Sequence, residues 1–174
     1  MSKIVSPYWQ YRNVPTNKLI TLDQVFERQV KLFPNKTVLK IAGQTITYED
    51  LDKLANRLAN MLQDMHHIEH GDIVAIHMKR SIQMIICIIA ILKAGAAFVI
   101  LNSDFSLERM KYILKDSQVR VLIHDSNQTE ILFNVACIKY GKGVVLYKHK
   151  NPVMRHNVED LAYVMYTTGT SGFP

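Results

Sequence analysis

A run of twenty residues, IQMIICIIAILKAGAAFVIL (82–101), constrains the fold more than any other part of the sequence, because Lys93 is its only charge. A membrane helix needs about 20 apolar residues, so hydropathy alone leaves two interpretations open. Lys93 followed by Gly95 is typical of a helix C-terminus, where a cation interacts favourably with the helix dipole and glycine can adopt a left-handed conformation. The sequence therefore predicts a buried helix over 82–93 and a buried strand over 97–101, and disfavours a membrane span.

The rest of the chain alternates between helical and extended patterns of hydrophobic residues. Thr21 with Gln24 forms the pattern of a capping box, and Thr47 and Ser106 are candidate N-caps. We expect helices over 21–33, 48–65 and 107–116, a hairpin over 37–48 that turns near Ala42 and Gly43, and strands over 73–77, 119–123 and 161–166. Further short strands are possible at EILFN (130–134), VACIKY (135–140) and VVLY (144–147). This alternation predicts an α/β fold of βαβ units, with a largely parallel sheet flanked by helices.

Composition narrows the classes of function. The 174 residues are 48% hydrophobic and 21% charged, which is typical of a globular domain, and no internal repeat is present. The net charge of +6 raises the possibility of nucleic-acid binding, but the densest basic groups, HMKR (77–80) and KHK (148–150), are too small for a convincing footprint. Cys87 and Cys137 lie in apolar stretches of the sequence. Two free, buried thiols fit a reducing cytoplasm better than a disulfide framework does. The N-terminus has no apolar segment of the signal-peptide kind, so we expect a cytoplasmic protein that binds neither nucleic acid nor membranes.

The histidine-rich segment HHIEH (66–70) invites a metal interpretation, because His66 and His70 have helical i, i+4 spacing. A zinc peptidase motif needs the glutamate beside the first histidine, whereas Glu69 lies beside the last. Histidines at a helix C-terminus also interact favourably with the helix dipole without a metal. We therefore predict no metal site, and no catalytic role for Cys87, which has no fixed histidine partner.

The last residues, YTTGTSGFP (166–174), have the composition of a loop that holds phosphate. Glycines allow the backbone to approach an anion closely, and successive N–H groups together with hydroxyls can bind it. The apolar run LAYVM (161–165) precedes them, and loops beyond the carboxyl ends of parallel strands are the usual ligand sites of open α/β sheets. The candidate phosphate-binding residues are Thr167, Thr168, Gly169, Thr170, Ser171 and Gly172. Composition alone fits a solvated linker equally well.

Four segments, in order, resemble the adenylate-forming enzymes, which include the adenylation domains of nonribosomal peptide synthetases and the acyl-CoA synthetases. ITYEDLDKLANRLA (46–59) is similar to the family's LTYxELxxxAxxLA, and residues 71–101 are similar to GDxVAIxxxRSxxMxxxxLAxLKAGxAYVPL. RMKYILKDSQVRVLI (109–123) is similar to RxxYxLxDSxxxxLL, and residues 161–174 are similar to the phosphate loop LAYxxYTSGTTGxPKG. Thr168 and Ser171 exchange serine and threonine relative to that loop but keep both hydroxyls.

The resemblance implies a lead segment over 1–20 and an incomplete N-terminal portion of an adenylation domain over 21–174, ending in the phosphate loop. It implies ATP with Mg²⁺ as cofactor, an amino acid or similar acid as substrate, and phosphopantetheine on a peptidyl carrier protein as acyl acceptor. The remainder of the domain, in the same or a complementary chain, would be a further partner. In the family the catalytic lysine, the Mg²⁺ and ribose ligands and the acyl pocket lie beyond residue 174, so no catalytic residue is assigned and the substrate is not identified.

Two functions of different kinds remain open. The chain is either part of an amino-acid-activating enzyme, inactive in isolation, or a non-catalytic remnant or interaction module that keeps the fold. The loop favours the first, because a decayed remnant has no need to keep four hydroxyls and two glycines.

Overall fold

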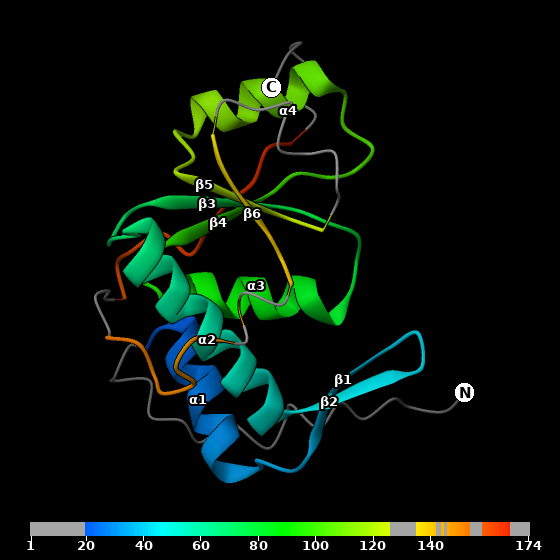
Figure 1. Cartoon of the computed structure of the whole chain (residues 1–174), viewed down its shortest axis with the longest axis vertical. Helices are drawn as coiled ribbons and strands as arrows, with labels where there is room; N and C mark the ends of the chain where they lie inside the picture. Colours follow the sequence, from blue (N-terminus) through cyan, green and yellow to red (C-terminus); the bar gives the residue numbers. More distant parts are fainter. Residues whose placement is uncertain (1–19, 126–134, 142–143, 145, 154–157, 168–174) are drawn as a thin grey trace.

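The computed structural model describes residues 20–125, 135–141, 144, 146–153 and 158–167, and these form a parallel sheet between two layers of helices (Figure 1). The helices are α1 (Leu22–Leu32), α2 (Tyr48–His66), α3 (Ile82–Lys93) and α4 (Leu107–Asp116). The antiparallel hairpin comprises β1 (Thr37–Ile41) and β2 (Gln44–Thr47). The main sheet comprises β3 (Ile73–His77), β4 (Ala97–Ile100), β5 (Val121–His124), β6 (Ala136–Lys139) and β7 (Tyr163–Val164). The predicted fold class is confirmed.

The order of the strands in the main sheet, β6-β5-β3-β4-β7, places the helices on opposite faces. The chain passes from β3 through α3 to β4 on one side of β3, and then through α4 to β5 on its other side. Because crossovers between parallel strands are right-handed, two crossovers in opposite directions put α3 and α4 on opposite faces. Figure 1 shows α4 on one face and α3, α2 and α1 on the other.

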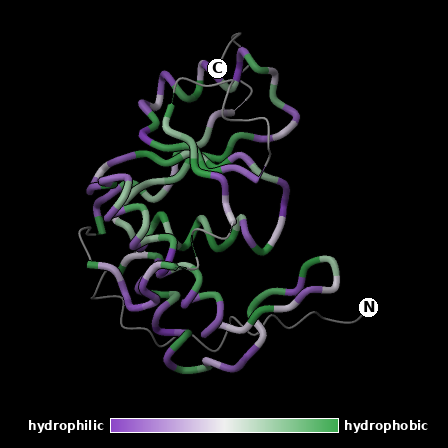
Figure 2. Tube along the Cα trace, in the orientation of Figure 1, coloured by the Kyte–Doolittle hydropathy of each residue, from purple (hydrophilic) through white to green (hydrophobic). Residues whose placement is uncertain are grey.

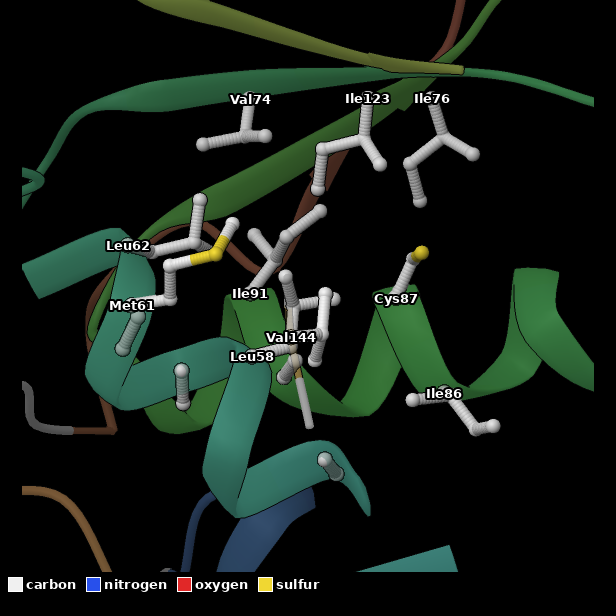
Figure 3. Close-up of a cluster of buried hydrophobic side chains, with 14 of the residues drawn as sticks. Leu58, Met61, Leu62, Val74, Ile76, Ile86, Cys87, Ile91, Ile123 and Val144 are labelled. Atoms are coloured by element: carbon white, nitrogen blue, oxygen red, sulfur yellow. The ribbon is translucent and has the colours of Figure 1, made fainter. Parts of the chain in front are cut away.

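Alternate strand residues fill the two halves of the core, as the two-residue period of a strand requires. In β3, Val74 and Ile76 pack in the cluster that α2 and α3 contribute to, whereas Ala75 packs with residues of α4. Figure 2 shows the apolar residues concentrated along the sheet strands and α3. Figure 3 shows Leu58 and Leu62 of α2 together with Ile91 of α3 beneath the sheet. Burial of each large aliphatic side chain contributes about 1.5–3 kcal/mol. The side chains between the sheet and helices α2 and α3 therefore contribute a large part of the stability of the fold.

The apolar run 82–101 forms a helix and then a strand, as predicted. α3 ends at Lys93, and Gly95 has a φ of 87°, the left-handed conformation that glycine tolerates best. The Ser81 side chain accepts a hydrogen bond from the Met84 N–H, which caps the helix. Within the described residues, no helix is long and apolar enough to cross a membrane.

Local signals elsewhere also gave correct boundaries. The Thr21 N–H donates to Gln24 Oε1 at 3.2 Å, and Thr47 and Ser106 cap α2 and α4. The β1–β2 hairpin turns at Ala42 and Gly43, whose φ angles of 49° and 81° are those of a two-residue hairpin turn.

The expected strand over 144–147 is wrong for the residues that the structure describes there. Val144 and Leu146 lie in a short 3₁₀ turn, in which the Tyr147 N–H donates to the Val144 carbonyl. Val144 is only 3% exposed and packs in the core beneath the sheet, so the apolar character that suggested a strand serves tertiary packing instead. The expected strand over 130–134 lies outside the described residues.

Lys93 joins three helices through a buried ionic cluster. Its side chain is 1% exposed, and its Nζ lies 2.5 Å from Glu27 Oε1 of α1 and 3.0 Å from Asp52 Oδ1 of α2. Asn151 Oδ1 lies 3.5 Å from the same nitrogen. The sequence correctly places Lys93 in the last turn of α3, but hydropathy gives no sign that this cation is paired in the interior. A cavity of about 40 Å³ adjoins the cluster.

A short segment, residues 148–153, is held against α2 by side-chain amides. The Asn60 Nδ2 group donates to the carbonyls of Lys148 and Lys150 at 2.9 Å each. Asn56 Nδ2 lies 3.0 Å from the His149 carbonyl, and Gln63 Nε2 donates to the Val153 carbonyl at 3.1 Å. Three amides on one stretch of helix therefore bind the backbone of a segment about 90 residues away in the chain. We call residues 148–153 the strap.

β7 is an edge strand of the main sheet and exposes a row of large apolar side chains. Leu161, Tyr163 and Met165 are 66%, 53% and 72% exposed, and their i, i+2 spacing puts them on one side of the strand. β7 pairs with β4 on its other side. An exposed apolar edge is a template for pairing with another chain.

We expect the 174-residue chain to self-associate through this edge. Multi-angle light scattering should show species larger than a monomer, and Met165→Lys should shift the population toward the monomer by adding a charge to the edge. Met65→Lys is the matched control, because Met65 is also a methionine, is 62% exposed and belongs to α2 and not to the β7 segment. A monodisperse wild-type monomer that binds no hydrophobic dye would contradict the prediction.

Candidate functional site

The carboxyl ends of the strands of the main sheet form one edge of the molecule, because all strand pairs in it are parallel. From this edge the chain leaves β3 toward α3 on one face and leaves β4 toward α4 on the other. Neighbouring strands whose connections diverge in this way leave a crevice at their carboxyl ends, where ligands of open α/β sheets bind. β7 lies next to β4, so the chain that leaves β7 emerges beside this crevice.

The predicted phosphate loop starts at this edge. Thr167, its first residue, is exposed three residues beyond the end of β7. The other candidate residues, Thr168, Gly169, Thr170, Ser171 and Gly172, lie outside the described residues, so they stay predictions from the sequence.

The root of the loop is attached to α4 by Tyr166. Its hydroxyl donates a hydrogen bond of 2.5 Å to Asp116 Oδ2, and its ring lies edge-on to that of Tyr112, with 6.4 Å between centroids and an interplanar angle of 86°. Desolvation and the hydrogen bond to Asp116 raise the pKa of Tyr166 to about 12, so the hydroxyl stays a donor at neutral pH. Tyr166, the residue before the loop, therefore has defined partners on α4, the helix that connects β4 to β5.

Sequence reasoning did not assign these α4 residues to the site. Tyr112 and Asp116 lie in the predicted helix over 107–116 and in the segment 109–123 that resembles the family, and neither feature indicates a role in a site. Their i, i+4 spacing puts them on one helix face and was visible in the sequence, but nothing there showed that Tyr166, 50 residues away, meets that face.

Cations lie near the same edge. Lys79 and Arg80 come two and three residues after the end of β3 and are both exposed, and the Lys79 N–H lies 3.4 Å from Asp125 Oδ2, just past β5. Exposed cations at the edge of the sheet where Thr167 lies would attract a polyphosphate by long-range electrostatics.

The histidine segment and Cys87 have defined surroundings in the structure. His70 Nε2 lies 2.7 Å from Asp160 Oδ1, and His67 has a φ of 48° where α2 ends. No group of His, Cys, Asp and Glu suited to a metal occurs within the described residues. Cys87 is buried, and burial raises the pKa of its thiol, which makes it a poor nucleophile.

A cavity of about 140 Å³ lies at the opposite, amino edge of the sheet. It is lined by the start of α1, including Thr21 and Asp23, and by residues that precede β4 and β7, including Ala96 and Asp160. Since those residues come before the strands, the cavity and Thr167 lie at opposite ends of the strands.

Comparisons with known proteins identify the family. The sequence model of the family described as AMP-binding enzyme matches residues 26–174. Tyrocidine synthase 1 of Brevibacillus parabrevis is 31% identical over 173 residues, which cover 95% of this chain. Gramicidin S synthase 1 of Brevibacillus brevis is 34% identical over 162 residues, which cover 88% of it. The chain spans 16% and 14% of the lengths of these two relatives.

A solved structure shows the same architecture. The N-terminal subdomain of Klebsiella oxytoca NpsA, in complex with anthranilyl-AMSN, superposes with a TM-score of 0.79 at 25% identity. The superposition covers 90% of this chain and 40% of that one.

Proposed function

Because the chain belongs to the AMP-binding enzyme family, whose members are adenylate-forming ligases, we propose that it is the N-terminal portion of an adenylation domain that activates an amino acid or similar carboxylic acid. In the complete domain, ATP and the acid would give an acyl-adenylate and pyrophosphate. The proposed division is a lead segment over 1–20 and the adenylation portion over 21–174. Alone, the chain would be inactive.

The observation that carries the proposal is the position of Thr167, at the carboxyl edge of the sheet beside the crevice between β3 and β4. A loop with the composition of residues 167–172 at that place would bind the β- and γ-phosphates of ATP through N–H groups and hydroxyls. As the α–β phosphate bond breaks, the same donors would stabilise the charge that develops on the leaving pyrophosphate.

The chemistry of the family supplies the remaining expectations. ATP with Mg²⁺ would be the cofactor, and an acyl acceptor such as the phosphopantetheine thiol of a peptidyl carrier protein would take the product. Further partners would be the rest of the adenylation domain and the amino-acid substrate. The two free cysteines and the use of ATP favour the cytoplasm.

The alternative is a non-catalytic module that keeps the sheet. The exposed apolar edge of β7 fits both functions, because it suits an interaction surface as well as the continuation of a sheet. The two functions differ in one measurable property, because only the first requires the loop to bind phosphate.

Binding of inorganic tripolyphosphate to the chain tests the proposal. We expect weak, saturable changes in amide NMR shifts, with the largest at Thr167 and the loop. The affinity would be low because ordering a loop costs about 1–2 kcal/mol per residue. Gly169→Val should remove the response, since a side chain there would block approach of the phosphate to the backbone.

The control variant for this titration is Gly141→Val, which changes a glycine with no atoms crowding its Cβ position in a loop after β6. Gly141→Val should bind as the wild type does. A wild-type chain that shows no response to tripolyphosphate would favour the non-catalytic module.

A further inference from the structure

The contact between α4 and the exit of β7 offers a role for residues that the proposed function has not used. Tyr112 and Asp116 lie four residues apart on one face of α4, and both contact Tyr166. The hydroxyl of Tyr166 meets Asp116 and its ring meets Tyr112, so one face of the helix fixes both the tip and the plane of this side chain. Tyr166 directly precedes Thr167.

The helix that supplies these contacts is itself held firmly. Ile113 and Leu114 of α4 are 0% and 4% exposed and pack with Leu122 of β5 and Val99 of β4. The Ser106 side chain accepts a hydrogen bond from the Arg109 N–H at the start of the helix. The face with Tyr112 and Asp116 is therefore fixed relative to the sheet.

β7, in contrast, provides little restraint of its own. Its ladder with β4 has two residue pairs, Phe98 with Tyr163 and Val99 with Val164. Tyr166 lies two residues beyond this ladder. Its side chain packs against the core cluster on the α4 side of the sheet and also bonds to Asp116, and these contacts place the chain between the ladder and the loop.

We infer that Asp116 and Tyr112 are positioning residues for the polyphosphate site: by holding Tyr166, they fix the direction in which the chain enters the loop at Thr167. The inference rests on the proposed function of the loop. It extends the site from the loop to α4, and it gives the segment 109–123 a role in nucleotide binding besides that of a core helix. Neither residue contacts the phosphates in this scheme.

The experiment is a titration of the full 174-residue chain with inorganic tripolyphosphate, followed by amide NMR shifts, for a set of single variants. Tyr166→Phe removes only the hydroxyl, and Asp116→Ala removes its acceptor. We expect each to weaken binding by about five- to tenfold, the effect of losing one hydrogen bond that is partly exposed to water. Asp116→Asn keeps an acceptor oxygen and should stay within about twofold of the wild type.

Tyr163→Phe is the matched control. Tyr163 lies on the same strand, is 53% exposed and contacts Phe98 through its ring, which phenylalanine preserves. It should bind as the wild type does. The double variant Tyr166→Phe, Asp116→Ala should bind no worse than either single variant, because both remove the same interaction.

Two readouts separate positioning from a general loss of structure. Asp116 is exposed, so the thermal midpoints of all variants should agree with that of the wild type while the affinities differ. Recovery of affinity by Asp116→Asn would be a second sign of positioning. Equal affinities for the wild type and Tyr166→Phe would overturn the inference and leave the proposed function standing. A wild-type chain that does not bind tripolyphosphate would overturn both, since there would be no site to position.

Discussion

The chain alone should show no amino-acid-dependent exchange of pyrophosphate into ATP. The reaction requires a carboxylate aligned with the α-phosphate and a cation near the developing charge, and alignment can lower the barrier by about 7–11 kcal/mol. The chain spans 16% of tyrocidine synthase 1, and the resemblance places the acyl pocket, the Mg²⁺ ligands and the catalytic lysine beyond residue 174. This chain would supply the loop that binds the leaving pyrophosphate.

The measurement is exchange of radiolabelled pyrophosphate against a panel of the twenty amino acids, with the chain alone and with the rest of an adenylation domain joined to it or added to it. Exchange should appear in the completed domain and should be abolished by Gly169→Val. Gly141→Val, in the loop after β6, should leave it intact. Clear exchange by the chain alone would contradict the site assignment and the expectation that the chain is inactive in isolation.

Lys93→Met should destabilise the fold by about 3–5 kcal/mol, because it removes the cation of a buried cluster and leaves its acidic partners unpaired. Glu27 and Asp52 are each 17% exposed, so water compensates only part of this loss. Urea unfolding followed by circular dichroism would give the free energies.

Lys53→Met is the control for this experiment. Lys53 also pairs with a carboxylate, Glu49, at 2.8 Å, but the two side chains are 43% and 46% exposed. Exposed i, i+4 pairs of this kind contribute little to stability, because water screens the two charges. A triple variant with Lys93→Met, Glu27→Gln and Asp52→Asn should recover most of the stability. Equal losses for Lys93→Met and Lys53→Met would show that burial of the cluster does not matter.

The sequence determined most of the fold because its local signals agree with the tertiary structure. Ser81 and Gly95 mark the two ends of α3, and the capping of α2 by Thr47 follows the pattern in the sequence. Prediction failed where the apolar character of a residue reflects tertiary packing and not its local secondary structure. Val144 looks like part of a strand because it is apolar, yet it is apolar because it fills the core beneath the sheet.

Only one of the two parts of the candidate site could be recognised from the sequence. Its loop could be recognised from glycines and hydroxyls that are contiguous in the chain. Its attachment could not, because the hydrogen bond from Tyr166 to Asp116 joins residues 50 positions apart, and either side chain alone looks like an ordinary surface residue. Lys93 is a similar case: its charge suggested a helix end, whereas its partners come from α1 and α2.

The way in which α2 holds the strap has a consequence for how this region can vary in evolution. Asn60 and Gln63 bind main-chain carbonyls, which every amino acid carries, so most side chains of the strap are free to drift. Asn151 is the exception, because its side chain accepts from Asn56 and lies near Lys93. An insertion or deletion within residues 148–153 would shift every carbonyl past its amide at once. Selection here should therefore preserve length rather than sequence. Homologues should differ in the amino acids of the strap but keep the same number of residues in it.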